Sequence, residues 1–176
     1  MKNIAVFGSS SIETWDPIWQ ESFNLGKAIA ELKMGVVTGG YYGVMGAVSK
    51  GAKLSGGESI GVISSSFTFR DGHNPWLTKV ITRDGIVDRI GGLLEISDAV
   101  VVMPGNIGTL NELLMLMTLW KVHESSVKAF VIKDPFEKTL NSLVENKILT
   151  EIDFLHLEFV ENIQEIIEKL KSTFNK

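Results

Sequence analysis

"VVMPGNIGTLNELLML", at residues 101–116, joins two kinds of local structure through one glycine-rich turn. The first three residues end an apolar, β-branched run, and the residues after Thr109 have the apolar spacing of a helix. Between them, Gly105 and Gly108 allow a tight turn and a close approach of a ligand to the backbone. The first N–H groups of a helix have no partner within it, so the segment predicts a strand, a loop and a helix with an anion site at the loop.

The same alternation of strand and helix extends along the chain in both directions. Short apolar runs predict strands, and longer segments of helical spacing lie between them. Nearly continuous apolar strands joined by helix-length connections are typical of a parallel sheet covered on both faces. We therefore predict an α/β fold, a Rossmann-like doubly wound parallel sheet with helices on both faces. The predicted strands are 4–7, 35–37, 59–63, 79–82, 99–103, 129–132 and 157–160; the helices lie between the first two strands and at 43–54, 85–96, 109–122, 136–147 and 161–174; and 64–77 is a loop that could serve as a lid.

Three turns of small residues are expected to meet at the carboxyl edge of this sheet, where doubly wound folds bind ligands. They are FGSSS at 7–11, TGGYYGVMG at 38–46 and PGNIGT at 104–109. A single glycine cluster is often only a tight turn, but three on one edge favour a nucleotide phosphate. They match neither the dinucleotide G-x-G-x-x-G pattern nor the P-loop, and the serines lack the hydrolase G-x-S-x-G pattern. The candidate binding residues are Gly8, Ser9, Gly39, Gly40, Gly43, Met45, Gly46, Pro104, Gly105, Asn106, Gly108 and Thr109.

Length and composition exclude several other classes of protein. A chain of 176 residues suits one domain, so residues 1–176 are predicted to form a single nucleotide-binding unit. It has no Cys and only three scattered His, so we expect no metal site. The net charge of −4, without a basic run, disfavours a nucleic-acid polymer as partner. The apolar runs are too short for a membrane segment or a signal peptide, which predicts a cytoplasmic protein.

Two of these motifs carry a resemblance to a known family. GGYYGVMG at 39–46, followed by SDAVVVMPGNIGTLNE at 97–112, resembles the LOG family of cytokinin riboside monophosphate phosphoribohydrolases, also labelled lysine decarboxylase-like. The resemblance implies cleavage of the N-glycosidic bond of an AMP-like nucleotide, with no cofactor. It also implies that Arg89 and Glu112 are catalytic, because they stand where the family has its Arg and its motif Glu. A glycosidic cleavage passes through an oxocarbenium-like state, which a carboxylate stabilises.

Each of these two residues also has a structural interpretation. Thr109 and Glu112 form a T-x-x-E pattern, which is typical of a capping box at a helix start. Arg89 could be a solvated charge paired with Asp88 or Glu95.

The chain departs from the family pattern at two positions in the predicted site. Ile90 replaces the Lys that follows the Arg, and Asn106 replaces the second Gly of PGGxGT. Asn tolerates left-handed backbone angles, so the turn is expected to survive. The loss of the Lys indicates a divergent bacterial-type branch whose substrate need not be a cytokinin precursor.

The helix over 109–122 is apolar on nearly all sides after its first turn, which favours burial against two partners. One side can pack on the sheet, and the other predicts a homodimer that buries Met115, Leu116 or Leu119, as in the family's homodimers.

Three other functions remain open on the sequence. Molybdenum-cofactor carriers share the fold and would bind without turnover, and a single-stranded DNA-binding relative is disfavoured by the acidic balance. Lysine decarboxylation would need a pyridoxal phosphate site, which no motif marks out.

Overall fold

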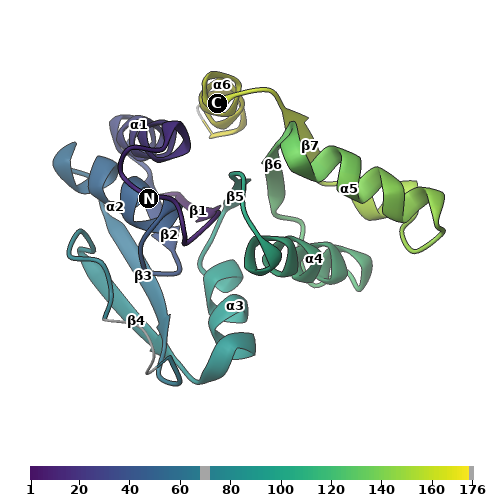
Figure 1. Ribbon diagram of the computed structural model, residues 1–176, viewed down its shortest axis with the longest axis horizontal. Coiled ribbons are helices and arrows are strands. Elements are labelled where there is room, and N and C mark those ends of the chain that lie inside the picture. The colour runs from purple at the N-terminus through teal and green to yellow at the C-terminus, as the bar shows by residue number, and fades with distance from the viewer. Residues whose placement is uncertain (68–71, 175–176) are drawn as a thin grey trace.

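Seven strands form one parallel sheet in the computed structural model, which describes residues 1–67 and 72–174 (Figure 1). Their order in the sheet is β4-β3-β2-β1-β5-β6-β7, and each neighbouring pair is parallel. The strands are β1 (Asn3–Phe7), β2 (Gly35–Thr38), β3 (Ser59–Ser64), β4 (Lys79–Arg83), β5 (Ala99–Val102), β6 (Lys128–Ile132) and β7 (Leu157–Val160). All seven predicted strands are present, which confirms the parallel α/β architecture.

Helices cover both faces of the sheet, as predicted (Figure 1). One face packs against α1 (Pro17–Glu31), α2 (Val44–Leu54) and α6 (Ile163–Phe174). The other packs against α3 (Gly85–Glu95), α4 (Ile107–Lys121) and α5 (Lys133–Glu145). None of the helices in the described part of the chain is both long and apolar enough to cross a membrane.

Strand β1 shows how the apolar pattern produces the two cores. Ile4 and Val6 lie in the cluster with α1, α2 and α6, while Ala5 and Phe7 lie in the cluster with α3, α4 and α5. Side chains of a strand alternate between the two faces of its sheet, and these four are almost completely buried. Full burial of a Phe or Ile side chain contributes about 1.5 to 3 kcal/mol, so a central strand must be apolar at every position.

Some predicted boundaries were wrong. Helix α4 begins at Ile107 and not at Thr109, and a 3-10 helix, η1 (Glu151–Phe154), was not predicted. Helix α5 spans Lys133–Glu145, but Asp134 has non-helical backbone angles, so its regular part starts close to the predicted residue 136. Leu116 was expected to be available to a second subunit, but it is fully buried in the core beneath α4. The predicted loop over 64–77 falls partly on residues 68–71, which lie outside the described residues.

The strand order places a topological switch point between β1 and β5. From β1 the chain continues through β2 and β3 toward one edge, and from β5 it continues toward the other. The connections on either side therefore diverge at the carboxyl ends of these two strands and leave a crevice there, which is where doubly wound sheets bind ligands.

Candidate functional site

A cavity of about 260 Å³ lies at this switch point. Residues after β1, β2 and β5 line it, together with residues of α3 and α4. Ser9 joins the three turns, because its N–H donates to the Pro104 carbonyl (3.1 Å) and its carbonyl accepts from the Val44 N–H (2.9 Å). The structure thus brings together the three small-residue turns that the sequence placed on one edge.

The predicted site residues divide into those that line the cavity and those that shape its turns. The lining set is Gly8, Ser9, Gly39, Met45, Arg89, Asn106, Gly108, Thr109 and Glu112. The remaining predicted residues, which are not among the lining residues, are Gly40, Gly43, Gly46, Pro104 and Gly105.

Two of the turn glycines are required by close packing. Gly43 has a φ of +66°, and a Cβ on it would collide with the Ser9 carbonyl. A Cβ on Gly105 would collide with the Thr109 hydroxyl and would lie 2.9 Å from the Ser9 nitrogen. Both glycines therefore hold the second and third turns against the first.

Arg89 projects from α3 into the cavity and is only 5% exposed. Its Nε donates to the Val62 carbonyl at 2.9 Å, and its Cζ lies 5.6 Å from the ring centre of Tyr41 and 5.7 Å from that of Phe67. A cation over aromatic faces at this distance is stabilised by the ring quadrupoles. A Cβ on Gly39 would collide with the guanidinium, so the absence of a side chain there makes room for it.

The interpretation of Arg89 as a solvated charge paired with Asp88 or Glu95 is therefore wrong. Arg83, at the end of β4, makes both of those ion pairs, at 3.5 and 2.7 Å. The sequence could not separate the two arginines, because the burial of Arg89 on α3 and the partial exposure of Arg83 at the end of β4 depend on how these elements pack in the tertiary structure.

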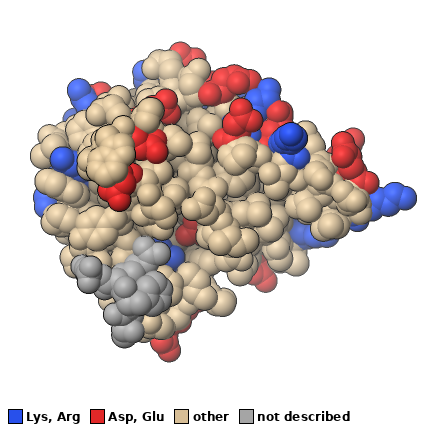
Figure 2. All heavy atoms as spheres, in the orientation of Figure 1, with Lys and Arg blue, Asp and Glu red and all other residues tan. Residues whose placement is uncertain are grey.

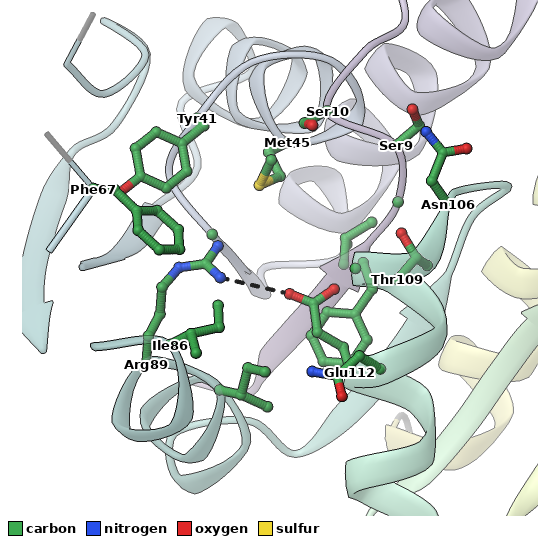
Figure 3. Close-up of a pocket in the computed structure, with 17 residues that line it drawn as sticks. Ser9, Ser10, Tyr41, Met45, Phe67, Ile86, Arg89, Asn106, Thr109 and Glu112 are labelled. Atoms are coloured by element: carbon green, nitrogen blue, oxygen red, sulfur yellow. Dashed lines mark ion pairs between the residues drawn. The ribbon is translucent and has the colours of Figure 1, made fainter. Parts of the chain in front are cut away.

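Glu112 lies on α4 and faces Arg89 across the cavity (Figure 3). Its Oε1 lies 3.8 Å from Nη1 of Arg89, and its side chain is 13% exposed. Burial raises the pKa of Glu112 to about 7, although the positive charge of Arg89 acts in the opposite direction. The carboxyl group is therefore poised to change its charge near neutral pH.

The capping-box interpretation of Thr109 and Glu112 is also wrong. Asn106 is the N-cap of α4, so Thr109 is already inside the helix, where it is almost completely buried. Residues three apart on a helix share a face, and both Thr109 and Glu112 line the cavity. The pattern arises from facing the pocket and not from capping the helix.

The cavity has two chemically different ends (Figure 3). Ser9, Asn106 and Thr109 lie at one end, beside the N-terminus of α4. Tyr41 and Phe67 lie at the other, beside Arg89. The Arg89–Glu112 pair stands between them, so a ligand with a polar and an aromatic part could contact both ends.

Comparison with known families agrees with this arrangement. The profile of the SLOG cluster4 family matches residues 1–146, which include all three turns, Arg89 and Glu112. The chain belongs to the SLOG cluster4 family. This confirms the resemblance that GGYYGVMG and SDAVVVMPGNIGTLNE carry.

Relatives of this SLOG chain carry the name of an enzyme. A protein of Mycobacterium tuberculosis named cytokinin riboside 5'-monophosphate phosphoribohydrolase is 28% identical over 173 residues, which cover 93% of this chain and 90% of that protein. A protein of Rhodococcoides fascians with the same name is 31% identical over 119 residues, which cover 66% of this chain and 60% of that protein.

Solved structures share the fold of this SLOG chain at lower identity. The molybdenum cofactor carrier protein of Chlamydomonas reinhardtii superimposes with a TM-score of 0.77 at 20% identity, covering 99% of both chains. The molybdenum cofactor binding protein of Rippkaea orientalis gives 0.75 at 23% identity and covers 98% of this chain and 96% of its own. These likenesses establish the architecture.

Asn106 and Ile90, where this SLOG chain departs from the LOG pattern, have clear places in the structure. Asn106 has a φ of −101°, which is extended, so the turn does not need the left-handed conformation for which Asn was expected to substitute. Its side chain makes no capping hydrogen bond, and it lies near Ser9 at the cavity (Figure 3). Ile90 is buried in the core and lines the cavity, so this part of the wall is apolar.

Several lining residues were missed by the sequence analysis. Tyr41 lies within the GGYYG motif, and its position between two glycines of a binding turn was an available signal. Phe67 and Ile86 precede and follow β4, and only the tertiary structure brings them to the cavity.

One face of the molecule carries mixed charge. On the face drawn in Figure 2, the described Lys and Arg side chains lie among Asp and Glu side chains and form no continuous basic area. Among residues 1–67 and 72–174, no group of three or more His, Asp or Glu side chains could hold a metal ion.

Proposed function

We propose that the protein hydrolyses the N-glycosidic bond of a nucleoside 5'-monophosphate and releases the free base and ribose 5-phosphate. The observation that carries the proposal is the Arg89–Glu112 pair, buried at 3.8 Å between a helix N-terminus and an aromatic wall. The names of the mycobacterial and Rhodococcoides relatives support the same reaction.

The phosphate is assigned to the polar end of the cavity. Helix α4 directs its unpaired N–H groups there, and the Thr109 hydroxyl and the Ser9 and Asn106 side chains lie beside them. The ribose then lies over Glu112, and the base extends toward Tyr41 and Phe67. An AMP complex in a crystal should show its phosphate at this helix end.

The chemistry assigned to the pair follows from charge. As the bond between C1' and the base nitrogen breaks, positive charge develops on the ribose ring, and the ionised Glu112 stabilises it. A water oxygen bonds to C1' as the bond from C1' to the base nitrogen breaks; one water proton passes to the departing base nitrogen, and the other remains on the new C1' hydroxyl. Arg89 holds Glu112 in place, and its positive charge increases the fraction of molecules in which the Glu112 carboxyl is ionised.

A panel of nucleotides tests the proposal directly. The purified protein is incubated with AMP, GMP, CMP, UMP and an N6-substituted AMP, and ribose 5-phosphate is quantified by chromatography. Adenosine without its phosphate is the control, and it should react poorly because it lacks the anchoring group. Tight binding of a nucleotide with no ribose 5-phosphate released would favour a carrier role like that of the molybdenum cofactor proteins.

Activity should depend on the ionisation of Glu112. Because the pKa of Glu112 is about 7, kcat/KM is expected to rise as the pH increases through about 7 and to level off above it. The pKa of the second ionisation of a phosphate monoester lies near 6. A rise of kcat/KM centred at about pH 6 would therefore report ionisation of the substrate and not of Glu112. The rate of ribose 5-phosphate release between pH 5.5 and 8.5 provides this measurement.

The assembly is proposed to be a homodimer. Met115 and Leu119 remain half-buried on α4, and Leu119 lines a second hollow between α3 and the end of α4. A second subunit would cover them. Light scattering at micromolar concentration should give twice the monomer mass, and Leu119→Glu should reduce it to the monomer; a monomeric wild type would contradict the assignment.

A further inference from the structure

Asn74, in the connection between β3 and β4, is a fully buried polar side chain outside the three turns. Its Nδ2 donates to the carbonyls of Gly40 (3.1 Å) and Tyr41 (2.8 Å). Its own backbone N–H also donates to the Gly40 carbonyl (2.9 Å), and its Oδ1 accepts from the Trp76 N–H (3.0 Å). An Asn amide has two donor hydrogens and a carbonyl oxygen, and each of these has a partner here.

The peptide that Asn74 holds is the one that supports Arg89. Gly40 has a φ of +80°, and its N–H donates to the Thr38 hydroxyl, so the turn is anchored from two sides. Tyr41 follows directly, and its ring faces the Arg89 guanidinium at 5.6 Å, while its hydroxyl accepts from the Ser64 N–H. Gly39, on the other side, is in contact with the same guanidinium.

We propose that Asn74 is a positioning residue: by fixing the Gly40–Tyr41 backbone, it sets the place of the Tyr41 ring and through it the orientation of Arg89 toward Glu112. The expected effect of Asn74 on turnover rests on the proposed function. Its effect on the Arg89–Glu112 geometry is independent of any reaction.

The surroundings of Asn74 show that its bonds to the turn are separate from the attachment of its loop. The loop is also held by Trp76, whose ring centre lies 5.0 Å from Nζ of Lys50, and by the Lys53 ammonium, which donates to the Pro75 carbonyl. At its far end, the Thr78 hydroxyl accepts from the Ser59 N–H and donates to the Ser59 carbonyl. Removing the Asn74 amide therefore leaves these other attachments in place.

The test compares Asn74→Ala with Thr78→Val. Asn74→Ala removes three side-chain hydrogen bonds, two to the glycine turn and one from the Trp76 N–H. Thr78→Val removes two, both to Ser59, and none to the glycine turn. Asn74→Ala is expected to lower kcat by about tenfold to a hundredfold, the scale for a small misplacement of a catalytic group, with a smaller change in KM. Thr78→Val should keep kcat within about twofold of wild type, because no bond to the cavity changes.

A second readout does not depend on turnover. Among residues 1–67 and 72–174, the ionisable side chains that line the cavity are Tyr41, Arg89 and Glu112, and the charge of Arg89 lowers the pKa of Glu112. If Asn74→Ala lets Arg89 move away, the pKa of Glu112 rises above that of wild type. Carbon-13 NMR of the Glu112 carboxyl measures this in the absence of nucleotide, and Thr78→Val should leave the value unchanged.

A graded variant protects the test against misfolding. Asn74→Asp keeps an acceptor oxygen for the Trp76 N–H. Burial favours the neutral form of the new carboxyl, which has one O–H donor in place of the two N–H donors of Asn. Its kcat and its Glu112 pKa should lie between those of wild type and Asn74→Ala. A folded Asn74 variant with the wild-type Glu112 pKa, or a Thr78→Val change of equal size, overturns the assignment. If no nucleotide is cleaved by the wild type, the proposed reaction fails, while the NMR comparison still decides the role of Asn74.

Discussion

Glu112→Gln is expected to reduce the rate of ribose 5-phosphate release at saturating nucleotide by about a hundredfold or more, the scale for losing one electrostatic contact made in a transition state. The substitution keeps the size of the side chain and removes its charge. Nucleotide affinity should change little, because the phosphate contacts lie at the other end of the cavity. The pH limb near 7 should disappear with the carboxyl group.

The same substitution should stabilise the fold above neutral pH. The pKa of Glu112 is raised from 4.5 to about 7 in the folded protein, so ionising this carboxyl lowers the free energy of unfolding. This loss of stability is absent below about pH 4.5 and reaches its full size above about pH 7. Gln has no charge to bury, so the free energy of unfolding of Glu112→Gln should exceed that of wild type by about 1 to 3 kcal/mol at pH 8. At pH 4.5 the two proteins should have similar free energies of unfolding.

Denaturant unfolding at both pH values measures this difference. Glu95→Gln, which alters an exposed carboxylate paired with Arg83, is the matched control and should change neither turnover nor the pH dependence. A Glu112→Gln protein that cleaves nucleotides at the wild-type rate would show that Glu112 has no catalytic role.

Arg89→Met is expected to lower turnover by about two to three orders of magnitude, because Glu112 loses the cation that holds it in place and favours its ionised form. Met fills most of the buried volume of the Arg stem, so the core beside Tyr41 stays packed. Removing one partner of a buried ion pair usually destabilises a protein, but Glu112 can take up a proton here because its pKa is already about 7. The loss should therefore appear in activity more than in stability.

Arg83→Met provides the control for this charge change. Arg83 stands at the end of β4 and pairs with Asp88 and Glu95 outside the cavity, so its removal should leave turnover within about twofold of wild type. Steady-state kinetics of the two variants at pH 8 distinguishes them. Equal losses from both would mean that net charge, and not the Arg89–Glu112 geometry, governs the rate.

Local sequence determined the order of elements and the positions of the turns. The strand around Val101, the glycines of 39–46 and the helix after Asn106 each show their conformation within a window of a few residues, because periodicity and glycine content act locally. Parallel strands necessarily bring their carboxyl ends to one edge, so the meeting of the three turns also followed.

The tertiary structure decided which charged side chains are buried at the site and how they are paired. Arg83 ends β4 and Arg89 lies on α3, and only the packing of these elements against the sheet leaves the first partly exposed and buries the second. Asn74 has no local pattern that distinguishes it from any loop asparagine, and its role appears only when its amide meets the Gly40–Tyr41 peptide. Burial and pairing depend on segments far apart in the chain, so the raised pKa of Glu112 and the anchoring of its partner could not be determined from local sequence.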